Sequence, residues 1–207
     1  GVVLENGDEL HDKTVVSSVD TKRTFLGFVG RDHLEDDFVS EIERYRYRGS
    51  SGKVNLALDA LPKFTAMTDP SLMQMIEICP SMDYLEQAYD DASYGGFSKR
   101  PYMDIIVPST MDPTMAPPGK HVMSIFVQYA SYDMPEYGNK DQQRDAFGNA
   151  VIDTLTEFAP NLKDIILHKQ VLTPWDLEQK FEISEGNIFH GELTLDQLFF
   201  FRPAPGY

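Results

Sequence analysis

The sequence has one cysteine, Cys79, in 207 residues. A single thiol excludes an internal disulfide and any metal site built from several cysteines. Basic residues are also scarce, since 18 Lys and Arg stand against 33 Asp and Glu and give a net charge of −15. Nucleic-acid binding requires a basic face that neutralises phosphates, so this charge balance argues against a nucleic-acid partner.

Long apolar runs are missing as well. No stretch of eighteen apolar residues occurs, so the sequence predicts no transmembrane segment. The opening residues, Gly1-Val2-Val3-Leu4, carry no basic part of a secretory signal. We expect a cytoplasmic protein, with a peripheral position at a membrane left open for a longer form. Because the opening residues resemble the middle of a hairpin, we also expect a fragment.

The motifs of self-contained active sites are absent. No G-x-G-x-x-G follows a strand pattern, and no Walker loop, G-x-S-x-G elbow or H-E-x-x-H pair is present. The five histidines are scattered singly through the chain, which favours structural or surface roles over metal binding. The motifs alone therefore indicate a domain with no metal and no complete catalytic centre.

Local patterns predict short elements throughout the chain. Asn6 and Gly7 match the two positive φ positions of a type I′ turn, which predicts a hairpin over residues 2–10. Asp20, Ser81 and Thr173 are placed to cap helices that begin just after them. The capped helices are expected at 22–28, at 82–94 and from 174. Further helices are expected at 35–48 and 141–159, and strands at 14–18, 53–61, 71–79, 103–107, 121–129 and 162–172, with a helix as the alternative at 71–79. Alternation places Val54, Leu56 and Leu58 on one face of the strand at 53–61, and it places Val122, Ser124, Phe126 and Gln128 on one side of the strand at 121–129. Connections are expected at 62–70 and at 108–119, and the four prolines of 108–119 predict a rigid connection.

Helices and strands mix without a strict βαβ rhythm. An apolar fraction of 42% and an aromatic fraction of 12% are values typical of a globular domain with a real core. The sequence therefore predicts an α+β fold, with a mixed and largely antiparallel sheet covered by helices.

The most unusual segment is 186–203, GNIFHGELTLDQLFFFRP. Polar and apolar residues alternate through 192–195, and three phenylalanines follow at 199–201. Three adjacent aromatic side chains cannot all face one side of a strand, so we expect a second body to cover part of this segment.

Several segments carry a resemblance to a known family. The chain resembles the carotenoid-desaturase-like branch of the flavin amine oxidase superfamily. Within that branch it is most similar to the pyridine nucleotide-disulfide oxidoreductase domain-containing protein 2 group, often labelled phytoene dehydrogenase-like. The matching segments keep their order along the chain and lie at 1–7, 15–17, 23–26, 53–64, 106–119, 121–129, 172–178 and 186–203.

The resemblance implies that two parts of the family's architecture are absent. Family members begin with a dinucleotide-binding βαβ unit and end with a glycine-rich segment that closes over FAD, and neither occurs in this sequence. The resemblance therefore implies a substrate-binding domain at 21–185, with 1–20 at the edge of the missing FAD domain and 186–207 returning toward it. FAD is the implied cofactor of the longer protein, and we do not expect this fragment to bind it.

The family's reaction is hydride transfer from substrate to flavin. Amine-oxidising relatives carry a lysine near the flavin on the strand corresponding to 53–58. Asn55 matches that lysine by spacing, and Lys53 lies on the same strand face. Asn55 cannot act as a base, so the resemblance favours desaturation or hydride transfer from an apolar substrate over amine oxidation. The remaining candidates for the substrate pocket are Gln128, Tyr129 and His190.

The candidates for cofactor contact are Ser17, Gly191, Gln197 and Arg202. For all of these residues an ordinary structural role is the alternative interpretation. The resemblance leaves two partners for the Phe199–Phe201 edge, the missing FAD domain or a second copy of the chain. Two further functions stay open: an interaction or dimerisation module, and a carrier of apolar ligands without catalysis.

Overall fold

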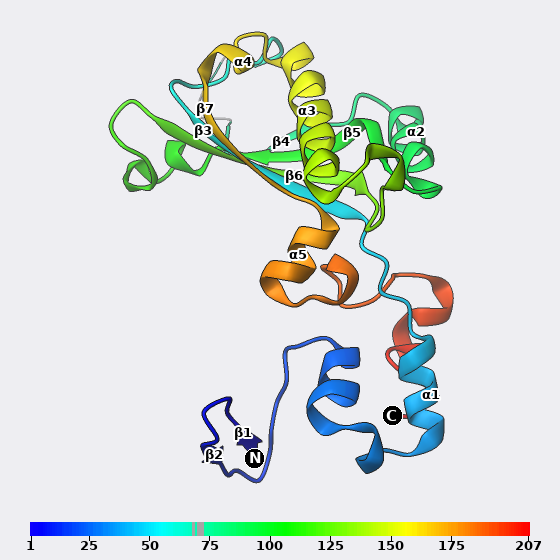
Figure 1. The fold of residues 1–207 in the computed structure, drawn as a ribbon. Helices are drawn as coiled ribbons and strands as arrows, with labels where there is room; N and C mark the ends of the chain where they lie inside the picture. The colour runs from blue at the N-terminus through cyan, green and yellow to red at the C-terminus, as the bar shows by residue number, and fades with distance from the viewer. Residues whose placement is uncertain (68, 70–72) are drawn as a thin grey trace. The chain divides into compact units, whose positions relative to one another are not determined.

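The computed structural model describes the chain except residues 68 and 70–72. The chain divides into two compact units, one made of Gly1–Arg46 with Phe189–Tyr207 and the other of Tyr47–Ile188 (Figure 1). Each unit has its own hydrophobic core. The domain boundaries expected near residues 20 and 185 stay a prediction.

The first unit opens with the predicted hairpin. Strands β1 (Val2–Val3) and β2 (Glu9–Leu10) pair in antiparallel fashion. The turn between them is not the predicted type I′ form, because Gly7 has a positive φ of 87° and Asn6 does not. The Gly7 N–H instead closes a turn on the carbonyl of Leu4 at 2.9 Å, and glycine adopts the required φ without steric cost.

The strand predicted at 14–18 is not formed. This segment has no regular secondary structure, and its side chains are exposed rather than buried. Val16, for example, is 90% exposed. A strand requires a hydrogen-bonded neighbour and a cover for its apolar side, and the described residues provide neither for this segment.

A small helical core holds the first unit together. Its helices are the π-helix η1 (Lys22–Val29), the 3₁₀ turn η2 (Arg31–His33) and α1 (Asp36–Arg44). Asp20 caps η1 as predicted, because its carboxylate accepts the N–H of Arg23 at 3.0 Å. The residues that form this core are Phe38, Ile42 and Ala204, with Phe25, Leu26 and Leu34 packed against them.

Helix α1 ends at Arg44 rather than at the predicted residue 48. The side-chain amide of Gln197 forms hydrogen bonds with both backbone groups of Arg46. The Arg46 N–H donates to Gln197 Oε1 at 2.9 Å, and Gln197 Nε2 donates to the Arg46 carbonyl at 3.1 Å. These bonds compete with helical hydrogen bonding and hold the backbone extended. The end of α1 is therefore set by a side chain from the far end of the sequence.

The C-terminal segment forms no strand from its alternating residues. It contains two 3₁₀ turns, η8 (Leu195–Gln197) and η9 (Phe199–Phe201). The three phenylalanines are 83%, 91% and 54% exposed in the described structure. This edge is thus an apolar surface of the first unit.

The second unit is built on a five-stranded antiparallel sheet with the order β4-β5-β6-β3-β7. The sheet and the helices beside it confirm the predicted α+β class. The strands are β3 (Ser51–Leu58), β4 (Ile76–Ile78), β5 (Phe97–Ile106), β6 (His121–Ala130) and β7 (Ile166–Leu172).

One face of this sheet is covered by α3 (Lys140–Phe158) (Figure 1). The alternation in β3 places Val54, Leu56 and Leu58 on the covered face, as predicted, and each is at most 2% exposed. The side chains that α3 packs against the sheet are Phe147, Val151, Ile152 and Leu155. The opposite face of β3 remains accessible, and that face carries the candidate site.

Caps start two further helices as the sequence predicts. Ser81 Oγ accepts the Tyr84 N–H at 3.1 Å and begins α2 (Met82–Ser93). Thr173 begins α5 (Pro174–Phe181), with a reciprocal bond from its own N–H to Asp176. The remaining short turns are η4 (Pro108–Thr110), η5 (Pro113–Met115), η6 (Pro135–Tyr137) and η7 (Ser184–Gly186).

Several predicted boundaries shift. The strand predicted from residue 162 begins at Ile166, because Leu162–Ile165 forms the short helix α4, whose Leu162 is fully buried in the core. Strand β5 starts at Phe97, earlier than the predicted residue 103. The predicted connection 62–70 and strand 71–79 fall in part on 68 and 70–72, which lie outside the described residues. The observed strand there is β4.

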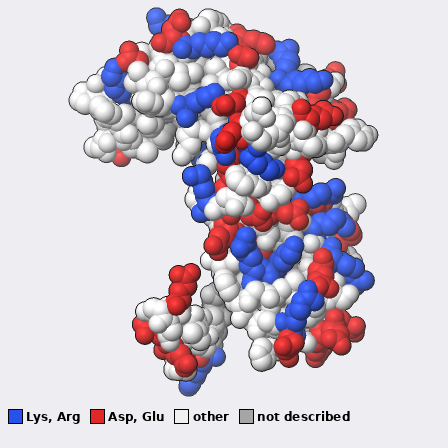
Figure 2. Space-filling view, in the orientation of Figure 1, with Lys and Arg blue, Asp and Glu red and all other residues white. Residues whose placement is uncertain are grey.

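Charged side chains of both signs are interspersed over the face of the molecule shown in Figure 2. Within the described residues, no helix is both long and apolar enough to cross a membrane. No group of three or more His, Cys, Asp and Glu side chains in the same part of the chain is arranged to hold a metal ion.

Candidate functional site

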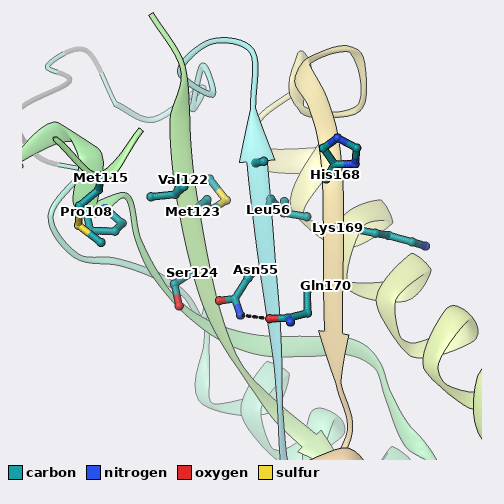
Figure 3. A pocket seen from close by; sticks show the side chains of 11 residues that line it. Asn55, Leu56, Pro108, Met115, Val122, Met123, Ser124, His168, Lys169 and Gln170 are labelled. Atoms are coloured by element: carbon teal, nitrogen blue, oxygen red, sulfur yellow. Dashed lines mark hydrogen bonds between the residues drawn. The ribbon is translucent and has the colours of Figure 1, made fainter. Parts of the chain in front are cut away.

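A groove of about 520 Å³ lies on the accessible face of the five-stranded sheet. Strands β3, β6 and β7 form its floor, and the connection 108–119 forms one side. Figure 3 shows the side chains around it. The lining residues are Asn55, Leu56, Ala57, Pro108, Met115, Val122, Met123, Ser124, His168, Lys169 and Gln170.

Three polar side chains from three neighbouring strands meet on the floor. Strand register places Asn55 of β3 opposite Ser124 of β6 on one side and opposite Gln170 of β7 on the other. Asn55 Nδ2 donates to Gln170 Oε1 at 3.0 Å (Figure 3). This row therefore joins amide and hydroxyl groups drawn from positions 55, 124 and 170 of the sequence.

The next row along the strands is less polar. Ala57 lies opposite Val122 of β6 and His168 of β7. Pro108 and Met115 approach from the connection between β5 and β6 and add apolar surface (Figure 3). One end of the groove is thus hydrogen-bonding and the other is mostly apolar, a composition typical of sites for small organic molecules.

The connection 108–119 is anchored to β6 by Ser109. Its hydroxyl accepts the N–H of Val122 at 3.2 Å and lies 3.1 Å from Nδ1 of His121. Ser109 is buried, and Pro108 and Pro113 fix φ at the start of two short turns. The predicted rigidity of this connection therefore has a structural basis, and it positions Pro108 and Met115 beside the sheet.

No carboxylate lines the groove among the described residues. Lys169 contributes to the lining, but its Nζ donates to Asn149 at 3.0 Å and lies 3.8 Å from the Asp145 carboxylate. The Lys169 ammonium group is therefore paired with α3 side chains and does not reach the polar residues of the floor. The polar surface of the groove is left to neutral amide and hydroxyl groups and to the imidazole of His168.

A second polar pair lies on the same sheet face, on β5. The Tyr102 hydroxyl donates to Asp104 Oδ1 at 2.7 Å. Burial and this hydrogen bond raise the pKa of Tyr102 well above its usual range. Tyr102 therefore stays protonated at neutral pH, and it acts as a hydrogen-bond donor rather than as a base.

The structure separates the predicted pocket residues of the second unit. Asn55 lies on the groove floor, and Lys53 lies on the same face of β3, two residues away and exposed. Gln128 pairs with Tyr102 and Ser51, farther along the sheet than the groove. Tyr129 lies beside α2, where its ring packs edge-on against Tyr89 with centroids 5.3 Å apart. The structure therefore joins only Asn55 directly to the groove.

The other predicted residues belong to the first unit. His190 and Gly191 have positive φ values of 55° and 137°. An added Cβ at Gly191 would lie 2.2 Å from the ring of Tyr45, so this position requires glycine. The Ser17 hydroxyl lies 2.8 Å from the hydroxyl of Thr24.

Gln197 and Arg202 hold the C-terminal segment in place. Gln197 is buried, and besides its two bonds to Arg46 it donates to the Glu192 carbonyl at 3.3 Å. Arg202 donates to the carbonyl of Phe189 and lies over the Tyr45 ring, 5.7 Å from its centroid. Both side chains therefore already have intramolecular roles.

The sequence interpretation missed Ser124, His168, Gln170 and Met115 as site residues. Alternation correctly placed Ser124 on one face of its strand, but it could not indicate which residue of another strand lies opposite. The pairing of Asn55 with Gln170 spans 115 positions. The sequence signal that could have indicated these residues is the run of polar residues in β7, a strand that is exposed over most of its length.

Comparison with known proteins supports the resemblance to the pyridine nucleotide-disulfide oxidoreductase domain-containing protein 2 group. The chain is 37% identical over 216 aligned residues to the pyridine nucleotide-disulfide oxidoreductase domain-containing protein 2 of Mus musculus, and equally to that of Rattus norvegicus. The alignment covers 99% of this chain and 37% of each relative. No protein-family model matches the chain. The chain is thus similar over nearly its whole length to these relatives, but it spans little more than a third of the length of each.

Proposed function

We propose that this chain is the substrate-binding part of an FAD-dependent oxidoreductase of the phytoene dehydrogenase-like type. The observation that carries the proposal is the groove on the accessible sheet face, with its hydrogen-bonding floor and apolar side. Such a surface binds and orients a largely apolar substrate, while the cofactor supplies the redox chemistry. The name of the mouse and rat relatives, which refers to an oxidoreductase domain, supports the reaction class.

In the part of the chain that the structure describes, no glycine-rich loop is arranged to fit the diphosphate of FAD. A dinucleotide site requires a glycine-rich loop that leads from a strand into the N-terminus of a helix. Gly95 and Gly96 lead from a helix, α2, into a strand, β5, which is the reverse of the required order. Gly49 and Gly52 lie at the start of strand β3 and lead into no helix. We therefore assign FAD to another part of a longer protein, and we assign one wall of the substrate site to this chain.

The residues of the first unit keep a proposed role beside the cofactor part. Ser17 and Gly191 are proposed contacts of the cofactor, and His190 is a proposed contact of the substrate. Gln197 and Arg202 are proposed to act by position, because their hydrogen bonds hold the backbone of this segment. Each of these roles is a proposal from the family resemblance.

The proposal is tested by filling the groove. Ser124→Trp places an indole on the floor, and it should weaken binding of a nine-carbon ketone, 2-nonanone, by about tenfold or more. Binding is followed by NMR of the isolated chain, through the methyl signals of Ala57, Val122 and Met115. Tyr94→Trp, at a position that is 98% exposed after α2, is the matched control.

The two variants separate the possible results. Loss of binding in Ser124→Trp with unchanged binding in Tyr94→Trp supports the groove as the ligand site. If the unsubstituted chain binds neither 2-nonanone nor a hydrocarbon of the same shape, the proposal is wrong. Binding of these ligands without flavin reduction in the longer protein would instead favour the carrier function.

A second candidate function rests on the exposed Phe199–Phe201 edge. Phe199 and Phe200 are each more than four-fifths exposed, and Leu195, four residues earlier in the sequence, is 87% exposed. Exposed apolar side chains in such a cluster are typical of contact surfaces. This candidate is an interaction or dimerisation module, and light scattering of the purified chain tests it, since a strict monomer at high concentration would remove dimerisation.

A further inference from the structure

We infer that the groove recognises an uncharged oxygen group, a carbonyl or a hydroxyl, on an otherwise apolar substrate. The inference rests on the proposed function of the groove as the substrate site. It comes from the juxtaposition of Asn55, Ser124 and Gln170 on the floor, next to the apolar part of the groove that contains Ala57, Val122 and Met115. A substrate that is hydrocarbon throughout would match only the second half of this surface.

The floor keeps unused hydrogen-bonding capacity. The bond between Asn55 and Gln170 uses one N–H and one carbonyl. An amide group carries two N–H donors and a carbonyl with two lone pairs, so whichever way the two amides are oriented, one NH₂ group and one carbonyl remain available. Within the described part of the chain, the Ser124 hydroxyl also has no side-chain partner.

Covering this row with hydrocarbon would be costly. Each polar group that leaves water without a new partner costs about 1–3 kcal/mol. An oxygen atom of the substrate accepts from the free NH₂ or from Ser124 and removes that penalty. Recognition of this kind discriminates strongly, because a ligand that lacks the oxygen leaves the site's own polar groups unpaired.

The charge around the groove selects among oxygen-bearing and nitrogen-bearing groups. No described residue that lines the groove is a carboxylate, so an ammonium group would meet no counter-charge. The charge of Lys169 is balanced by Asp145, and Lys53 lies two residues outside the lining. The row of Asn55, Ser124 and Gln170 therefore carries no charge of its own, and its neutral groups pair best with a neutral carbonyl or hydroxyl.

The inference is tested with three ligands of similar length. These are 2-nonanone, its hydrocarbon isostere 2-methyl-1-nonene and nonylammonium, titrated into the full 207-residue chain at neutral pH and followed by NMR. We expect the ketone to bind about tenfold more tightly than the isostere. Burial of apolar surface alone predicts the reverse order, since the hydrocarbon is the less soluble ligand.

Variants of the floor assign the preference to named groups. Asn55→Leu should weaken binding of the ketone by about tenfold and leave binding of the hydrocarbon unchanged. Asn55→Asp should raise the affinity for nonylammonium, because it supplies the missing negative charge. Asn6→Leu makes the same change at an exposed residue of the first unit and is the control. If Asn55→Leu does not fold, Gln170→Leu replaces it, since Gln170 is exposed on β7.

The outcomes distinguish this inference from the function on which it rests. Equal binding of ketone and hydrocarbon by the unsubstituted chain would overturn the inference and leave the substrate site in place. An unchanged preference in both Asn55→Leu and Gln170→Leu would overturn it as well. Failure of all three ligands to bind would overturn both proposals.

Discussion

Single residues in the first unit are fixed by close contacts rather than by propensity. Gly191 has a φ of 137° and lies against the ring of Tyr45, which in turn lies under Arg202. Burial raises the pKa of Tyr45, and the nearby charge of Arg202 opposes that rise. The neutral phenol is therefore the packing partner that Gly191 accommodates.

Gly191→Ala should destabilise the first unit by about 3 kcal/mol, because it combines backbone strain with overpacking against Tyr45. The measurement is urea unfolding followed by signals of the first unit. Gly7→Ala is a matched control: its φ is also positive, at 87°, but an added Cβ there meets no atom within 4 Å. An equal loss of stability in both variants would assign the effect to strain alone.

At the scale of elements, the start of α5 is fixed by a charged group. Asp176 closes the capping box with Thr173 and accepts from Arg144 Nη2 at 2.6 Å, which links α5 to α3. Burial raises the pKa of Asp176, but the hydrogen bonds from Arg144 and Thr173 outweigh that effect and hold the pKa below its ordinary value. The ionised form therefore stabilises the fold.

A carboxylate with a lowered folded pKa contributes stability above its unfolded pKa, near 3.9, and loses it as the pH falls below that value. Asp176→Asn should thus lower the free energy of unfolding by about 2 kcal/mol at pH 7. The difference from the unsubstituted chain should shrink below about pH 4. Urea titrations at both pH values measure it.

Asp141→Asn is the control for this prediction. Asp141 also accepts from Arg144, at 2.6 Å, but its side chain is 86% exposed. Exposed ion pairs contribute little, so this variant should change stability by less than about 1 kcal/mol. A loss as large as that of Asp176→Asn would show that the shared arginine, rather than the buried cap, carries the effect.

Features that depend on near neighbours followed from the sequence, and features that depend on distant partners did not. The caps at Ser81 and Thr173 each accept a hydrogen bond from the backbone N–H three residues later in the sequence. The alternation in β3 likewise marked its buried face. The groove depends instead on Gln170 lying beside Asn55, and the end of α1 depends on Gln197. No local pattern contains those long-range pairings.

At the scale of the whole molecule, similarity to the mouse and rat relatives extends over 99% of the chain but only 37% of each relative. The described residues contain a groove but no dinucleotide loop leading into a helix. We therefore expect that, when the isolated chain is mixed with FAD and passed over a gel-filtration column, FAD will elute separately from the protein. Flavin absorbance that elutes with the protein in a one-to-one ratio would contradict the assignment of the cofactor to another part.

The groove takes its floor from strands and one side from the connection 108–119. The floor residues are tied to the register of the sheet, whereas Met115 belongs to a segment anchored at Ser109. For the substrate proposed above, changes in that connection would alter the length of apolar tail that fits without disturbing the polar row at Asn55. A groove built in this way would allow evolution to vary the preference for the tail and the recognition of the oxygen group independently.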